Sequence, residues 1–189
     1  KLQEGVKPFS FSQVKQIVEK ELGKPIEAIF SSFDQQPLAA ASVGQVHKAA
    51  LKNGITVAVK VQRQGIAEIF ESDIDLLYSL ARILEKRAPE IREYNPVGII
   101  QEFERYTKKE IDYLFEAKNI DIFYESFKDD PTVRIPKVYW EHTTSKVLRM
   151  EYIPGIRVSE MQKFKKLHID RKKVGKNVLV VRGRKTNGT

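Results

Sequence analysis

A single lysine among valines is the residue of this sequence best placed to do chemistry. Lys60 follows Val57-Ala58-Val59 and precedes Val61, and this alternation predicts a strand. An unpaired charge in a buried strand is strongly unfavourable. Lys60 therefore either faces solvent or serves a phosphate together with a carboxylate partner.

A stretch of small residues lies upstream of this lysine. Ala39-Ala40-Ala41-Ser42 is followed by Val43-Gly44, and small side chains let a backbone approach a ligand closely. An Asn53-Gly54 turn then joins two predicted strands, since this dipeptide is the strongest short hairpin signal. The pattern predicts a nucleotide-binding hairpin that carries Lys60. Ser42 could offer its hydroxyl or amide to a phosphate, or it could simply form the turn.

Periodicity and capping signals predict the elements that position this hairpin. Helices are expected over 12–22, with Ser12 as N-cap and Gly23 as the stop, over 25–30, over 66–88 and, as one long helix, over 95–127. Strands are expected over 37–41, 45–51, 56–62, 134–141 and 146–152. The expected fold is α+β, with a small five-stranded antiparallel sheet.

The predicted 95–127 helix carries carboxylates beside an apolar face. Glu110 falls between Ile99 and Phe103, where a carboxylate needs a partner. Asp112 and Glu116 share the neighbouring edge, and like charges at this spacing mildly destabilise an isolated helix. A cation is therefore expected to face that edge, with a solvated acidic face as the simpler alternative.

Four motifs in order resemble the UbiB family of atypical kinase-like ATPases, also called the ADCK group. Val57–Lys60 is similar to the Val-Ala-Ile-Lys strand of kinases. Ala39–His47 resembles this family's loop, in which alanines replace the kinase glycines. Lys109–Asn119 resembles its acidic helix and Met150–Gly155 its hinge. The resemblance covers roughly residues 1–173 and implies a protein-kinase-like N-lobe decorated by extra helices.

The resemblance implies roles for particular residues. Lys60 would contact the phosphates of ATP or ADP, and Glu116 would hold its ammonium group in place. Glu110 and Asp112 resemble the family's regulatory Glu-x-Asp motif, which faces a Lys-x-Gly-Gln motif that this sequence lacks. Loop and hinge residues would complete the nucleotide site: Ala39, Ala40, Ala41, Ser42, Val43, Gly44, Met150, Glu151 and Tyr152.

The family's catalytic loop and metal-binding motif, expected after residue 173, have no counterparts in this sequence. No residue is therefore assigned to catalysis or metal binding, Mg²⁺ is expected only with the C-lobe, and no turnover is expected from these 189 residues. By resemblance the full-length protein would support isoprenoid quinone (ubiquinone-type) biosynthesis. It would be cytoplasmic and peripheral to a membrane, with lipid or quinone-pathway membrane proteins as partners.

Composition narrows the class of protein. The chain is 41% hydrophobic and 31% charged, which is ordinary for a soluble globular protein. It has no cysteine, so disulfides and thiolate metal sites are excluded. No segment resembles a signal peptide or a membrane span. His47 is expected to be structural, because a single histidine between strands is more often structural than a catalytic base. No spacing of His, Asp and Glu resembles a metal site.

The net charge of +8 belongs to the C-terminal tail. Residues 163–189 hold ten Lys or Arg and one Asp, which leaves about −1 for the rest of the chain. We therefore expect three segments: an N-terminal helical segment 1–35, a kinase-like N-lobe through the hinge 36–162 with a helical insert 66–94, and a basic tail 163–189 that is disordered or non-native.

Two alternatives to nucleotide binding follow from other classes of function. The tail could bind a polyanion, although the near-neutral body makes nucleic acid an unlikely partner. The chain could instead be a non-catalytic interaction module, in which the helices bind a partner and the hairpin is structural.

Overall fold

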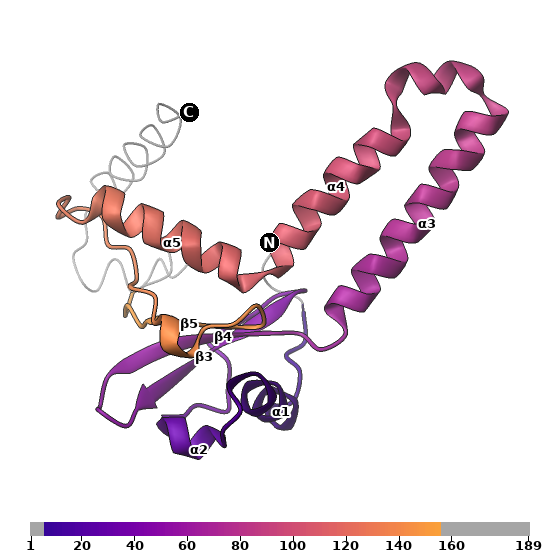
Figure 1. Ribbon diagram of the computed structural model, residues 1–189. Coiled ribbons are helices and arrows are strands. Elements are labelled where there is room, and N and C mark those ends of the chain that lie inside the picture. Colours follow the sequence, from indigo (N-terminus) through magenta and orange to yellow (C-terminus); the bar gives the residue numbers. More distant parts are fainter. Residues whose placement is uncertain (1–5, 156–189) are drawn as a thin grey trace, which may run out of the picture.

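The computed structural model describes residues 6–155, which form one antiparallel sheet with helices on both faces. The helix α5 covers one face, and α1 and α2 cover the other (Figure 1). The elements in chain order are α1 (Phe11–Leu22), α2 (Ile26–Ile29), β1 (Phe30–Phe33), β2 (Ala39–Ala40), β3 (Gly44–Leu51), β4 (Thr56–Gln62), α3 (Ile66–Arg87), η1 (Pro89–Tyr94), α4 (Pro96–Ile111), α5 (Tyr113–Phe127), η2 (Trp140–His142) and β5 (Val147–Glu151). The basic tail lies outside the described residues.

The sheet places Lys60 at its centre. Its strand order is β1-β3-β4-β5, with β2 pairing to β3 beside this path. Lys60 on β4 lies opposite Val46 of β3 and Leu148 of β5. Side chains alternate along a strand, so the valines of β4 and Lys60 lie on opposite faces. The valines are fully buried in the core shared with α1: Val57, Val59 and Val61.

The N-cap of α1 lies two residues earlier than expected. Ser10, not Ser12, is the N-cap: its hydroxyl accepts a hydrogen bond from the Gln13 amide, and the Gln13 side chain accepts one from the Ser10 amide. This is a capping box, and its Ser-x-x-Gln signature was readable in the sequence. Gly23 ends the helix with φ 66°, as expected.

The five-stranded antiparallel sheet is confirmed, although one predicted strand is absent and another strand takes its place. The predicted strand 134–141 is wrong: Val138 forms one isolated bridge to Met150, and η2 follows. Pro136 lies inside this segment and has no N–H to give to a ladder. The fifth strand is instead β1, whose Phe30 is buried against β3 in a segment expected to end a helix.

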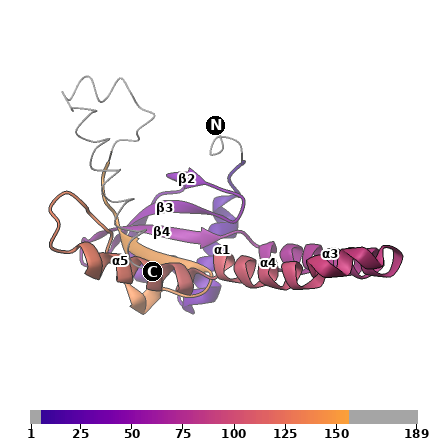
Figure 2. The ribbon, with the colours of Figure 1, turned by 90° about the horizontal axis from the view of Figure 1, so that it is seen from above.

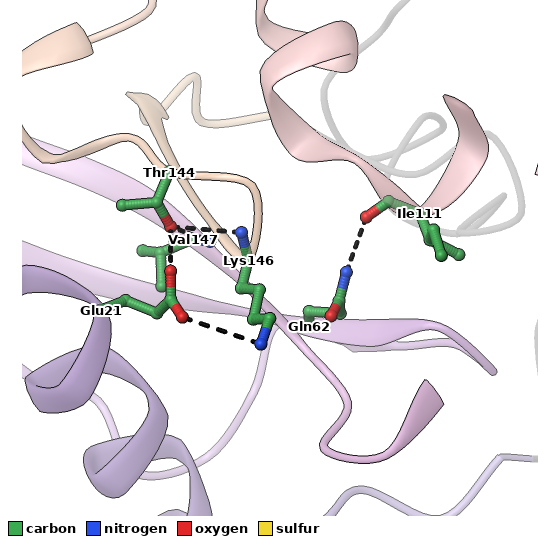
Figure 3. Close-up of polar contacts among 6 residues, drawn as sticks. All are labelled: Glu21, Gln62, Ile111, Thr144, Lys146 and Val147. Carbon is green, nitrogen blue, oxygen red and sulfur yellow. Dashed lines mark hydrogen bonds and ion pairs between the residues drawn. The ribbon is translucent and has the colours of Figure 1, made fainter. Parts of the chain in front are cut away.

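The long helix expected over 95–127 is also wrong, because it breaks at Asp112. This residue is extended (φ −88°, ψ 105°), and its carboxylate accepts a hydrogen bond of 2.9 Å from the Leu114 amide as the N-cap of α5. Gln62 Nε2 donates to the Ile111 carbonyl at 2.6 Å (Figure 3), and the Tyr113 amide donates to the Ser145 carbonyl at 3.0 Å. The freed backbone groups are thus satisfied by the sheet and its loops.

The break separates a projecting arm from the helix that covers the sheet. The predicted helix over 66–88 is observed as α3, and the Asn95-Pro96 start of α4 is confirmed. These two helices pack side by side and extend away from the sheet (Figures 1 and 2). No helix within residues 6–155 is long and apolar enough to cross a bilayer.

A second polar junction ties α1 to the turn before β5. Thr144 donates its hydroxyl proton to the Glu21 carboxylate at 2.8 Å, and the same oxygen accepts from the Lys146 and Val147 amides at 3.1 Å (Figure 3). Lys146 Nζ lies 3.9 Å from the other Glu21 oxygen. The start of β5 is therefore fixed against the N-terminal helix.

Candidate functional site

Lys60 and Glu116 form an ion pair between the sheet and α5. Lys60 Nζ lies 2.6 Å from Glu116 Oε2 and donates a hydrogen bond to it. The side chains are 22% and 36% exposed, so the pair is open to solvent on one side. The cation expected to face the acidic edge of the helix is thus Lys60. Exposed ion pairs contribute little to the stability of a fold, so the main effect of this pair is to hold the Lys60 ammonium group in position.

A buried tyrosine lies beneath this lysine. Lys60 Nζ is 4.5 Å from the centre of the Tyr113 ring, within range of a cation–π interaction. Tyr113 is fully buried, and its hydroxyl has no hydrogen-bond partner among the described residues. Burial, with the Glu116 charge as a smaller cause, raises the pKa of this hydroxyl well above its usual value. Tyr113 directly follows Asp112 in the sequence, but no pattern there marks it as a site residue.

Gly44 is required by packing inside the protein. A β-carbon at this position would lie 2.3 Å from the Tyr113 hydroxyl oxygen and 2.5 Å from the Val61 carbonyl oxygen. Both distances are far shorter than a van der Waals contact. The sequence predicted a small residue here for the approach of a ligand. The structure supplies a different reason, which is the close contact of β3 with Tyr113 and β4.

The small-residue loop is a hairpin turn between β2 and β3. The Ala41 amide donates to the Gly44 carbonyl at 2.8 Å and closes the turn. Ala39, Ala41 and Ser42 are exposed, whereas Ala40 and Val43 are half-buried. The turn therefore presents backbone and small side chains to solvent at one end of the sheet.

Arg63 holds this loop in place and was missed by the sequence analysis. Its Nε donates to the Ser42 carbonyl at 3.0 Å, and its backbone amide donates to the Val43 carbonyl at 2.8 Å. A terminal nitrogen donates to the Ala41 carbonyl at 3.5 Å and to the Lys7 carbonyl at 3.2 Å. One side chain thus joins the end of β4 to the loop and to the N-terminal segment.

The hinge candidates lie at the end of β5. Met150 pairs with Ala58, which is two positions from Lys60 and so shares its face of the sheet. The Tyr152 ring lies 5.2 Å from Lys48 Nζ, and the Tyr152 amide donates to the Thr56 carbonyl at 3.4 Å. The Glu151 carboxylate pairs with Arg134. Ala58 and Lys48 therefore lie on the same face of the sheet as Lys60 and Met150.

The two residues of the acidic motif are separated by the helix break. Glu110 lies exposed in the last turn of α4, on a face where Ile99 and Phe103 are 62% and 47% exposed. The expectation that Glu110 falls in a buried apolar arc is wrong. Its nearby carboxylate raises the pKa of the Tyr106 hydroxyl. Asp112 caps α5 and so lies one turn before Glu116.

His47 is fully buried and hydrogen-bonded within the fold. The amide nitrogen of Gln45 lies 2.9 Å from His47 Nε2 and must donate to it, so His47 Nδ1 carries the proton and donates to the Asp34 carbonyl at 2.8 Å. Burial lowers the pKa of this imidazole. These contacts give His47 a structural role.

The arrangement can hold an anion beside Lys60, with Glu116 and Tyr113 fixing the ammonium group. Within residues 6–155, no group of three or more His, Cys, Asp or Glu side chains is placed to hold a metal ion.

Comparison with known proteins identifies the family and the fold of this chain. The family model for the ABC1 atypical kinase-like domain matches residues 1–186, which includes most of the basic tail. The chloroplast protein ACTIVITY OF BC1 COMPLEX KINASE 8 of Arabidopsis thaliana is 44% identical over 93% of this chain. The probable protein kinase UbiB of Pseudomonas fluorescens (strain Pf0-1) is 41% identical over 85% of it.

A solved structure has the same fold. Rv3197 of Mycobacterium tuberculosis, determined as a complex with erythromycin, matches 82% of this chain with a TM-score of 0.71 and 32% identity. The match covers 39% of Rv3197, and the chain spans 23% of the Arabidopsis protein and 30% of the Pseudomonas protein. The expected kinase-like fold is confirmed, and the chain belongs to the family of ABC1/UbiB atypical kinase-like proteins.

Proposed function

We propose that this chain is the ATP- or ADP-binding N-lobe of a UbiB-type atypical kinase. The observation that carries the proposal is the 2.6 Å pair between Lys60 of β4 and Glu116 of α5. Kinases use such a pair to hold a lysine against the nucleotide phosphates. Family membership supports the same assignment, because the Val-Ala-Val-Lys strand lies within a chain that has a kinase-like fold.

The remaining contacts to nucleotide follow from the position of this pair. The turn over 39–44 would cover the phosphates, and the backbone of Met150, Glu151 and Tyr152 would receive the adenine. Asp112 would act indirectly, because it caps the helix that carries Glu116. Glu110 would keep a regulatory role at the exposed end of α4.

The activity of the whole protein is a proposal as well, because the chain spans only 23% of the Arabidopsis relative and 30% of the Pseudomonas relative. Mg²⁺ and catalytic residues would come from the C-lobe motifs, so this chain alone would not turn over. The reaction would support ubiquinone-type isoprenoid quinone biosynthesis at a membrane surface, with lipids or quinone-pathway proteins as partners.

A second candidate function, partner binding without nucleotide, is favoured by the arm formed by α3 and α4. Several large apolar side chains of the arm are about half exposed or more, including Leu76 at 59%, Ile83 at 51% and Ile99 at 62%. Exposed apolar surface of this kind marks interaction sites. An interaction module would keep its partner affinity when Lys60 is replaced.

Thermal unfolding with and without millimolar Mg-ATP or Mg-ADP tests the proposed function. A nucleotide that binds the folded state of a protein raises the melting temperature of that protein. We expect a rise for the wild type that is lost in Lys60→Ala. Lys108→Ala is the matched control, because Lys108 forms an ion pair of the same 2.6 Å length with Glu104 on the arm. An equal rise in Lys60→Ala and Lys108→Ala would contradict a nucleotide site at Lys60.

A further inference from the structure

Arg149 of β5 is a cation buried inside the fold. Its side chain is 5% exposed, and its Nε has no partner among the described residues. The nearest carboxylate oxygen, on Glu141, lies 3.9 Å away, beyond hydrogen-bond range, on a side chain that is 81% exposed. The guanidinium group stacks over the Tyr139 ring at 5.2 Å. The described residues thus give this buried charge one distant carboxylate on an exposed side chain and leave its Nε without a hydrogen bond.

Such an arrangement is unfavourable unless an anion completes it. Arginine stays protonated in proteins, so it cannot escape burial by losing its proton. Burial does lower the pKa of Arg149, which reports the same desolvation penalty. A buried charge of this kind is normally paired and hydrogen-bonded.

Arg149 lines a hollow of about 270 Å³ in which a second polar side chain, 3.8 Å from the same Glu141 oxygen, also lacks a hydrogen bond among the described residues. The Nδ1 atom of His142 is buried there without a hydrogen bond among the described residues. Lys52 and Asn53 line the same hollow, and its apolar wall includes Ile55. Polar donors and apolar walls in one concave site are the usual features of a small-molecule pocket.

The charges around the hollow favour a dianion. Arg149 and Lys52 line it, and the positive charge of Lys24 also acts on His142. Glu141 is the one acidic side chain that lines the hollow, and it is mostly in solvent. A phosphate monoester matches the two cations that line the hollow, Arg149 and Lys52, better than a single carboxylate does.

This hollow lies on the face of the sheet opposite Lys60. Arg149 is paired with Val59 across the sheet, and Val59 lies in the core shared with α1. Lys60 is paired with Leu148, which packs against α5. A ligand in the hollow would therefore not compete for the Lys60 site.

We propose that the hollow is a second binding site, which takes a small phosphate monoester with a short apolar group. Arg149 would donate two parallel hydrogen bonds to the phosphate oxygens, and His142 would donate a third. Lys52 would contribute charge at the edge, and the apolar group would lie against Ile55 and Tyr139. The proposal does not depend on nucleotide binding.

The test is binding of inorganic phosphate and phenyl phosphate to the 189-residue chain at constant ionic strength. We expect both to raise the melting temperature in a saturable way, phenyl phosphate at lower concentration because its ring adds apolar contact. Arg149→Met should weaken binding by about tenfold or more, since it removes a charge-assisted, bidentate contact. Arg105→Met removes an exposed arginine of the arm and should leave binding unchanged, as should Lys60→Ala.

Nuclear magnetic resonance of the arginine Nε–H groups provides a readout that needs no variant. The Arg149 signal should shift with phenyl phosphate in the wild type, even if Arg149→Met fails to fold. No saturable stabilisation, an equal effect in Arg149→Met, or an unmoved Arg149 signal would each overturn the proposal. Phenyl phosphate binding no tighter than phosphate would overturn the assignment of an apolar group.

Discussion

The hydroxyl oxygen of Tyr113 lies where a side chain at residue 44 would have to go. A β-carbon on Gly44 would come within 2.3 Å of it. The same tyrosine ring supports Lys60 Nζ at 4.5 Å. The glycine of β3, the first residue of α5 and the lysine of β4 are therefore coupled through one buried ring.

Gly44→Ala is expected to destabilise the fold by about 1–3 kcal/mol, the usual effect of overpacking. Chemical denaturation measures the change. The Val61 carbonyl, at 2.5 Å, is backbone and cannot rotate away. Tyr113→Phe removes only the hydroxyl, so the double variant should recover part of the loss. Purely additive effects would show that the two residues are not coupled.

Tyr113→Phe alone is expected to leave the free energy of unfolding unchanged or slightly higher. The hydroxyl is buried without a partner among residues 6–155, so its removal breaks no hydrogen bond described here. Denaturation curves of the variant and the wild type provide the comparison. A loss above about 1 kcal/mol would mean that this hydroxyl has a partner after all.

Asp112→Ala should destabilise the protein by about 1 kcal/mol, because it removes the N-cap of α5. Asp112→Ser keeps an oxygen that can accept from the Leu114 amide and should retain most of the stability. If the serine and alanine variants were equally unstable, capping would not be the role of Asp112.

Stability should fall as the pH is lowered below about 6.5, the ordinary pKa of histidine. Burial lowers the pKa of His47 in the folded state, so the unfolded chain binds its proton more readily. The contribution is fully present above the unfolded pKa and is lost as the pH falls toward the folded one. Unfolding free energies between pH 5 and 8 measure it, and His47→Gln should flatten the profile.

His142 complicates this profile in a predictable way. Its pKa is also lowered, by burial and by the charge of Arg149. His142→Gln should therefore reduce the slope in the same pH range without abolishing it. A profile unchanged in both single variants would contradict the assignment of the slope to these two imidazoles.

Arg63→Met should loosen the turn over 41–43. The variant removes the guanidinium contacts to the carbonyls of Ala41, Ser42 and Lys7. Faster hydrogen exchange of the Ala41 amide, which closes the turn, is the expected result. Arg105→Met is the matched control, because Arg105 pairs with Glu102 on the exposed surface of the arm. Unchanged exchange in Arg63→Met would show that the turn is held by its backbone alone.

Local signals in the sequence predicted the hairpin and the pair of charges. The Asn53-Gly54 turn and the alternation around Lys60 are short-range patterns, and both strands that they predict are observed. The role of Glu116 as the partner of Lys60 was predicted from the family resemblance, in which the spacing of several motifs is fixed. These features depend on residues close together in the chain or on a known family pattern.

The features that were missed depend on contacts between distant residues. Helical periodicity continues on both sides of Asp112, so it gave no sign of the break that Gln62 and Ser145 stabilise from elsewhere in the chain. Arg63 resembles any surface arginine until the loop carbonyls are placed around it. Side-chain partners of this kind are set by tertiary structure, which single-sequence patterns do not contain.

The helix break at Asp112 links the arm formed by α3 and α4 to the Lys60–Glu116 ion pair. Gln62 donates a hydrogen bond to the Ile111 carbonyl at the base of the arm, and it lies two residues after Lys60 on β4. Glu116 lies in the first turn of the helix beyond the break. The arm thus joins the sheet beside both members of the pair, and we expect a displacement of the arm to move Lys60 and Glu116 relative to each other.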